Sequence, residues 1–202
     1  LYTVKAADRQ LWYQVETGQA IVAPLARLDN LLFVASEDFT FCAVDPLSRT
    51  YKWEFTSGLP IRKGPVAIDN DLYVLPDRGG MYCLDPNSGA RRWWKPELTN
   101  FVAVTGGAVA ASDADGNLTM VSRSSGETIG SLPLRRFTVR TVNDRTDRIF
   151  LATESGLVIC LRQIGHPYPV YHRYPDRLPL LPEIEPEDSS EAPAETDAQP
   201  EQ

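Results

Sequence analysis

The sequence predicts an all-β fold, and the observation behind this prediction is a strand-like pentapeptide that recurs along the chain. Its copies begin at Leu1, Phe41, Met81, Leu118 and Val158, so they are spaced by 40, 40, 37 and 40 residues. Three copies are followed at a similar distance by a tryptophan, and no segment has a convincing helical period. A repeat of about 40 residues with several short strands per unit is typical of a β-propeller with four-stranded antiparallel blades.

The middle repeat contains all four strands expected of a blade. The segments between them carry Asp69-Asn70, Gly79-Gly80 and Pro86 to Gly89, which are residues that adopt positive φ or preset a bend. The four predicted strands are Leu59–Ile68, Asp71–Leu75, Met81–Asp85 and Arg91–Lys95.

The other repeats follow the same scheme with some losses. The preceding one has its turn at Asp29-Asn30 and predicted strands at Ala20–Ala26, Leu31–Ala35, Phe41–Asp45 and around Trp53. The following one is degenerate, with strands at Ala108–Ala111 and Leu118–Ser122 and no tryptophan after them. The last one has Phe137–Arg140, Arg148–Ala152 and Val158–Arg162, with Pro169–His172 as the candidate fourth strand. Together with a half-blade at the start, about four blades are present, and we expect them to be part of a larger ring.

Two regions follow from composition. Residues 1–174 are predicted to form the blades, and residues 175–202 a disordered acidic tail rich in Pro and Glu. The tail has nine acidic residues and one Arg, a charge of −8, so the remainder is close to neutral against a total of −7. No apolar stretch is long enough for a transmembrane helix, which needs about 18 residues. Because Leu1 falls on a repeat strand, we also expect upstream sequence to be missing.

The cysteines and histidines do not form a recognisable site. Cys83 and Cys160 occupy the position that holds Ala43 in another repeat, and Cys42 lies on the opposite strand face. All three are therefore expected to be structural thiols, with no disulfide. The only histidines, His166 and His172, lie beyond the repeats without a carboxylate or thiolate cluster, so no metal site is predicted.

The repeat resembles that of the PQQ-like (quinoprotein, tryptophan-docking) β-propeller family. The resemblance rests on the Leu-Tyr-small-Leu-Asp strand, the Gly-containing turn, the tryptophan and the Pro-led strand that follows, and it covers residues 1–162. It implies that Trp12, Trp53 and Trp93 pack between neighbouring blades. Trp94 would point to the other strand face, and the equivalent tryptophan near Ile129–Gly130 is lost.

The quinone-binding members of this family place the cofactor beside a calcium ion, held by Glu and Asn with an Asp base, and many cap it with adjacent cysteines. Here no adjacent cysteines exist, and Asp45 and Asp85 belong to the repeated turn, where an Asp accepts backbone N–H groups. We therefore assign no catalytic, cofactor-binding or metal-binding residue and no cofactor, and we do not expect an enzyme.

The resemblance favours the non-catalytic branch of the family, similar to the outer-membrane assembly lipoprotein propeller. It implies a protein-binding or scaffold module of a bacterial envelope protein, located in the periplasm or cell envelope. The alternative is a fragment of a PQQ-dependent dehydrogenase whose quinone and calcium site lies on missing blades. A protein partner is expected and nucleic acid is not. Self-association through an open blade edge is expected as well, since unpaired strand edges and apolar patches drive association.

Overall fold

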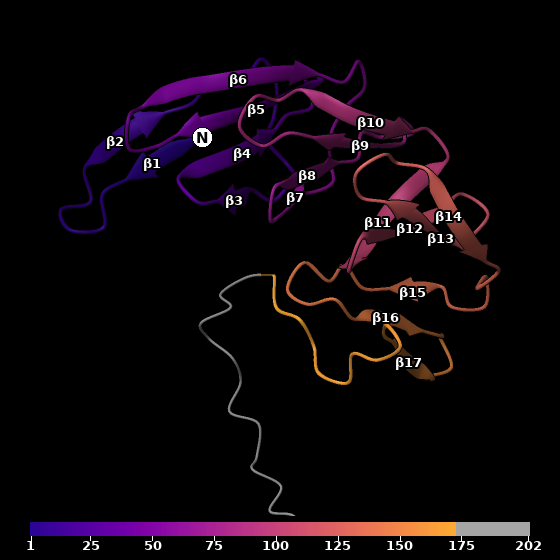
Figure 1. Cartoon of the computed structure of the whole chain (residues 1–202). Helices are drawn as coiled ribbons and strands as arrows, with labels where there is room; N and C mark the ends of the chain where they lie inside the picture. The colour runs from indigo at the N-terminus through magenta and orange to yellow at the C-terminus, as the bar shows by residue number, and fades with distance from the viewer. Residues whose placement is uncertain (173–202) are drawn as a thin grey trace, which may run out of the picture.

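The computed structural model describes residues 1–172, and these residues form seventeen strands without a helix (Figure 1). The strands make five separate antiparallel sheets, three with four strands, one with three and one with two. The all-β prediction is therefore confirmed, and so is the count of about four blades and a half-blade. In this part of the chain, nothing helical is long and apolar enough to cross a membrane. The predicted boundary at residue 174 and the acidic tail lie outside the described residues.

The sheets follow one another as blades, and each is a meander of strands adjacent in sequence. The half-blade is β1 (Tyr2–Val4) and β2 (Leu11–Gln14). The first blade is β3 (Ala26–Leu28), β4 (Leu31–Ala35), β5 (Thr40–Asp45) and β6 (Thr50–Thr56). The second is β7 (Val66–Ile68), β8 (Asp71–Val74), β9 (Met81–Leu84) and β10 (Arg91–Lys95). The third is β11 (Leu98–Thr105), β12 (Ala108–Asp113), β13 (Leu118–Ser122) and β14 (Thr128–Leu132). The fourth is β15 (Val139–Arg140), β16 (Ile149–Ala152) and β17 (Val158–Leu161).

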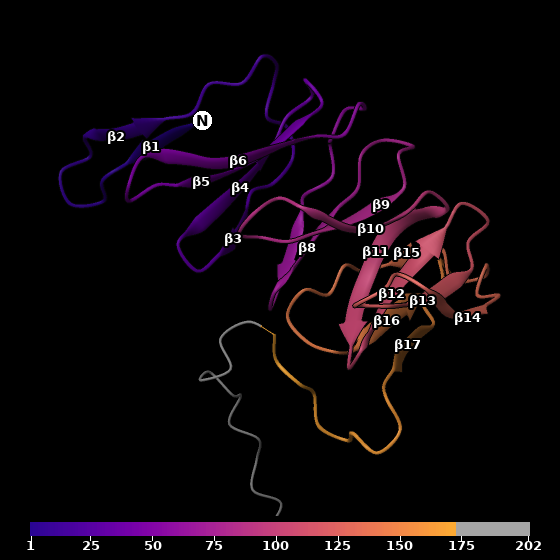
Figure 2. The ribbon, with the colours of Figure 1, turned by 45° about the horizontal axis from the view of Figure 1, so that its top comes forward.

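The blades are arranged as an open arc. The first strand of each blade lies on the inner side and the last strand on the outer side (Figures 1 and 2). Contacts between the inner strands β3 and β7 join the first two blades, and a parallel bridge from Ala103 of β11 to Asn143, in the loop after β15, joins the last two. The half-blade lies at one end of the arc and β15–β17 at the other, so each terminal sheet has a blade on one face only (Figure 1).

The hydrophobic core is divided into layers, one between each pair of neighbouring sheets. Phe33 and Phe41 of the first blade pack with Leu72 of the second, and Tyr73 of the second packs with Phe101 of the third. Strands β5, β8 and β9 are buried along most of their length because both faces of a central blade are covered. This is why their sequences read as continuous apolar runs rather than as an alternation.

Two predicted first strands are too long. The strand predicted at Leu59–Ile68 is restricted to Val66–Ile68, and the one at Ala20–Ala26 begins only at Ala26. Prolines interrupt both segments and cannot donate to a ladder. The backbone before β7 instead links blades, because the Ile61 N–H donates to the carbonyl of Ser36 at 3.4 Å.

The predicted fourth strand of the last blade, Pro169–His172, is wrong. This segment bonds to the loop before β16, where the Asp147 N–H donates to the Val170 carbonyl at 3.1 Å and Tyr171 bridges Thr146. The buried guanidinium of Arg148 fixes its start by donating to the carbonyls of His166 (2.9 Å) and Pro167 (3.0 Å). Within residues 1–172, β17 therefore pairs with β16 alone.

Candidate functional site

Three tryptophans join neighbouring blades through the same hydrogen bond. The indole N–H of Trp12 donates to the carbonyl of Pro46 at 2.7 Å, that of Trp53 to Pro86 at 2.9 Å, and that of Trp93 to Arg123 at 2.8 Å. Each acceptor directly follows the repeated pentapeptide of the next blade, so the contact repeats with the fold. The predicted wedging of these tryptophans between blades is confirmed.

The turn that receives each indole is shaped by one residue with positive φ. In the second and third blades it is Gly89 (φ 71°) and Gly126 (φ 72°). A Cβ at Gly89 would lie 2.5 Å from the ring of Trp53, so the close approach requires glycine. In the first blade the same position is Arg49 (φ 58°), whose guanidinium lies 3.9 Å from the ring centroid of Trp12 as a cation–π contact.

The aspartates at these turns have the predicted structural role. Asp45 Oδ1 accepts the N–H groups of Leu47 (2.9 Å) and Ser48 (3.2 Å), and Asp85 Oδ1 accepts the equivalent pair. The pKa of Asp85 is lowered, first by the hydrogen bond from the Arg92 guanidinium and also by the turn N–H groups, which outweigh burial. Both carboxylates are therefore committed to holding the turn, as an Asx turn requires.

A buried carboxylate connects the second and third blades. Asp71 is 5% exposed and accepts Arg92 at 2.5 Å and Arg123 Nη2 at 2.7 Å, while the hydroxyl of Tyr73 donates to it at 3.1 Å. Burial raises the pKa of the nearby Cys83 thiol to about 12, so this thiol is not a nucleophile at neutral pH. The charges are paired and hydrogen-bonded, which is the arrangement of a structural ion cluster.

That the chain has no catalytic, cofactor-binding or metal-binding residue stays a prediction. Among residues 1–172, no group of three or more His, Cys, Asp or Glu side chains could hold a metal ion. His172 is occupied in another way, because its Nε2 lies 3.1 Å from the carbonyl of Val104. Cys42 and Cys83 are buried free thiols, but Cys160 is exposed, so the prediction of three packed thiols is wrong at this position.

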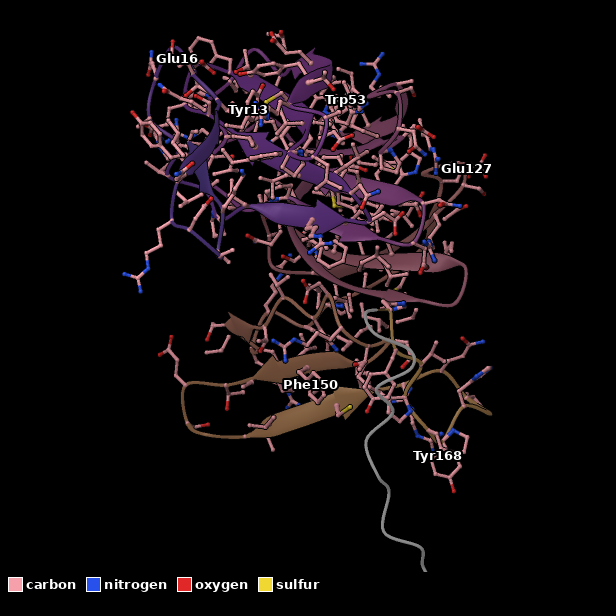
Figure 3. The ribbon with its side chains drawn as sticks, turned by 90° about the vertical axis from the view of Figure 1, so that its left-hand side faces the viewer. Tyr13, Glu16, Trp53, Glu127, Phe150 and Tyr168 are labelled. Carbon is pink, nitrogen blue, oxygen red and sulfur yellow. The ribbon has the colours of Figure 1, made fainter. Side chains whose placement is uncertain are left out.

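Cys160 belongs to an uncovered sheet face at the end of the arc. Its partner across the ladder is Phe150, and Val139, Ala152 and Val158 are aligned on the same face. Val158 is 64% exposed and Phe150 38% exposed, whereas the opposite face packs Ile149 and Leu151 into the core. Figure 3 shows Phe150 on this last sheet, apart from Tyr13 and Trp53 at the other end of the molecule.

The half-blade has a similar uncovered face at the other end. Tyr2, Val4 and Leu11 are more than half exposed, while Tyr13 on the other face packs against the first blade. The sequence predicts an open edge and an exposed apolar face on the half-blade at residues 1–16, and the exposure of Tyr2, Val4 and Leu11 agrees with it. The face on the fourth blade was not predicted, because a propeller strand has apolar residues on both sides. The candidate site is Phe150, Val158 and the edge of β17, which no strand within residues 1–172 pairs with, since it combines exposed apolar side chains with an open strand edge.

Solved structures with the same fold were found. BamB of Moraxella catarrhalis superposes with a TM-score of 0.58 at 18% identity, covering 75% of this chain and 49% of its own. The computationally designed Ika8 protein gives a TM-score of 0.60 at 14% identity, covering 79% and 51%. The designed Ika4 protein gives 0.58 at 16% identity, covering 76% and 98%. At these identities the likeness shows the fold.

The chain differs in length from these solved structures. It spans about half the length of the BamB chain and nearly all of Ika4. No curated protein matches it. At the sequence level, residues 2–165 match the family described as outer membrane protein assembly factor BamB. That match covers the half-blade and all four blades, including the three docked tryptophans, and the chain belongs to this family of PQQ-like repeat propellers.

Proposed function

We propose that this chain is a non-catalytic protein-binding or scaffold module of a bacterial envelope protein. The observation that carries the proposal is the fourth blade, where the edge of β17, left unpaired by the strands of residues 1–172, adjoins exposed Phe150 and Val158. The family supports the class of function and the compartment, because the protein that gives it its name is an outer membrane protein assembly factor.

Strand addition is the binding mode that fits this edge. An extended peptide aligned with β17 would satisfy the free backbone N–H and C=O groups, and its alternate side chains would reach Val158 and Cys160 on the uncovered face. Main-chain hydrogen bonds then supply affinity, and the apolar face selects the side chains.

The test is site-specific photo-crosslinking in the bacterial envelope. A photoreactive amino acid at Val158 is expected to give a discrete adduct with a different protein, and Phe150→Glu is expected to weaken it. The matched control is Leu47, which is 68% exposed but lies in a turn of the first blade. Equal adducts at both positions, or adducts only with a second copy of the chain, would contradict the proposal.

A second measurement separates this function from that of a dehydrogenase fragment. Pyrroloquinoline quinone with calcium is added to the chain and its melting temperature is followed. We expect no saturable shift. A saturable shift at micromolar quinone would overturn the non-catalytic assignment, whatever the crosslinking result.

A further inference from the structure

The junction between the third and fourth blades lacks the tryptophan that fastens the others. In the ladder, Trp53 is opposite Ala43 and Trp93 is opposite Cys83. The same register in the third blade places Gly130 opposite Met120. The strand β14, which carries Gly130, is exposed along its whole length, whereas Trp93 in β10 is buried.

A hollow of about 440 Å³ lies at this junction. Its lining includes Met120 and Ile129 from the third blade and Ile149 and Leu161 from the fourth. A Cβ built on Gly130 has no heavy atom within 4 Å, and the neighbour Ile129 and the ladder partner Met120 both line the hollow, so a side chain at this position has space toward it. The volume falls in the range of small-ligand pockets, about 300–1,000 Å³.

The acceptor for an indole N–H has a counterpart here. Pro46, Pro86 and Arg123 follow the third strand of their blades, and the equivalent residue of the fourth blade is Gln163. Gln163 lines the hollow, and its carbonyl accepts one hydrogen bond, from the His166 N–H at 3.2 Å. A carbonyl oxygen has two lone pairs, so it can accept a second donor.

The chain has no tryptophan left to fill this hollow. It contains four, and three are docked at the other junctions. The fourth, Trp94, stacks on Tyr82 with a centroid separation of 5.8 Å and donates its N–H to the carbonyl of Gly79. Any indole in the hollow must therefore come from another molecule.

We infer that the hollow at Gly130 is a binding site for an indole ring. Most of the wall is apolar, as the faces of an indole require, with Thr105, Arg162 and Gln163 as its polar part, and the Gln163 carbonyl is the acceptor for the indole N–H. The three occupied junctions of the same chain show the mode of binding. The ring can come from a tryptophan side chain of a peptide or from a free indole compound, since both offer the same group.

The first experiment titrates the full chain with 5-fluoroindole and with N-acetyl-tryptophanamide, followed by fluorine NMR and by thermal shift respectively. Saturable binding of either is expected. Tighter binding of the amide points to a peptide source, and tighter binding of the free indole points to a small molecule. No saturable binding of either probe up to millimolar concentration would overturn the inference.

Variants locate the binding. Gly130→Trp is expected to fill the hollow, abolish binding of both probes and raise the melting temperature. The matched control Ser131→Trp adds an indole at the next, exposed residue of β14, whose register partner is Thr119, and is expected to leave binding unchanged. Binding that persists in Gly130→Trp would place the probe elsewhere and contradict the site.

A third variant tests the site even if Gly130→Trp does not fold. Ile129 is 64% exposed, so Ile129→Asp is compatible with folding yet puts a charge on the wall of the hollow. Ile129→Asp is expected to lower the affinity for both probes at least tenfold. It should change the melting temperature of the free protein by no more than a few degrees. Unchanged affinity would contradict the inference.

Discussion

Removing the indole of Trp93 is the most direct test of how the blades are joined. Its side chain is only 6% exposed and packs with Tyr73 at a centroid separation of 6.0 Å. Replacing such a buried aromatic residue with alanine costs about 3–5 kcal/mol. In a chain of this size we therefore expect Trp93→Ala to lower the melting temperature by about 6–20 °C.

Trp93→Phe divides this loss into two parts. Phenylalanine keeps most of the apolar ring but loses the N–H that donates to the Arg123 carbonyl at 2.8 Å. A lost hydrogen bond of this kind is worth about 1 kcal/mol, and more if the carbonyl is left without a partner. The phenylalanine variant should thus lie between the wild type and the alanine variant.

The assay is thermal unfolding followed by far-ultraviolet circular dichroism, because removing a tryptophan changes the fluorescence. Trp94→Ala is the control, since this neighbouring side chain is 44% exposed and lies on the other face of β10. Its stacking on Tyr82 is worth about 1 kcal/mol. Equal losses for the two alanine variants would refute the docking argument.

Three further outcomes are expected. Gly126→Ala should cost about 2 kcal/mol or more in thermal melts, because φ is positive and the new Cβ would meet the docked indole, whereas Gly107→Ala, in open space, should stay close to wild type. Asp85→Asn should destabilise the protein at pH 7. The Arg92 hydrogen bond lowers the pKa of Asp85, so the stabilisation that the ionised carboxylate gives the folded state is fully present above the ordinary pKa of 3.8 and is lost as the pH falls through the folded-state pKa. A difference from wild type that is the same at pH 7 and pH 3 would contradict this. With a maleimide, Cys160 alone should react in the native protein and all three thiols in urea, and a silent native protein would show that this sheet face is covered.

The repeat made most of the fold predictable. The second and third strands of each blade are continuous apolar runs between turn residues, and the Asp29-Asn30 and Asp69-Asn70 turns have the expected positive φ at their aspartates. The first strands were less predictable, because Pro65 ends a linking segment rather than interrupting a strand. The wrong fourth strand has a tertiary cause, since the side chain of Arg148 holds the segment that contains Pro169.

The candidate site could not be read from the sequence for a related reason. Cys83 and Cys160 occupy the same position in their repeats, yet the first is buried and the second exposed. The difference is that another blade covers the sheet face of Cys83 and none within residues 1–172 covers that of Cys160. The residues around each cysteine do not predict this difference. The lost tryptophan near Gly130 was visible in the sequence, but only the packing of the fourth blade shows that a hollow remains there.

Uneven fastening of the blades has a mechanical consequence. In a repeat array each unit contacts only its neighbours, so overall stability is a sum over units and joints. Among the four joints of residues 1–172, the one at Gly130 lacks an indole, so we expect bending or fraying to begin there. If it does, we expect the fourth blade to pivot at β11 and the Ala103–Asn143 bridge. A ring inserted at this joint stiffens it, which would couple occupancy of the hollow to the angle at which β17 presents its edge.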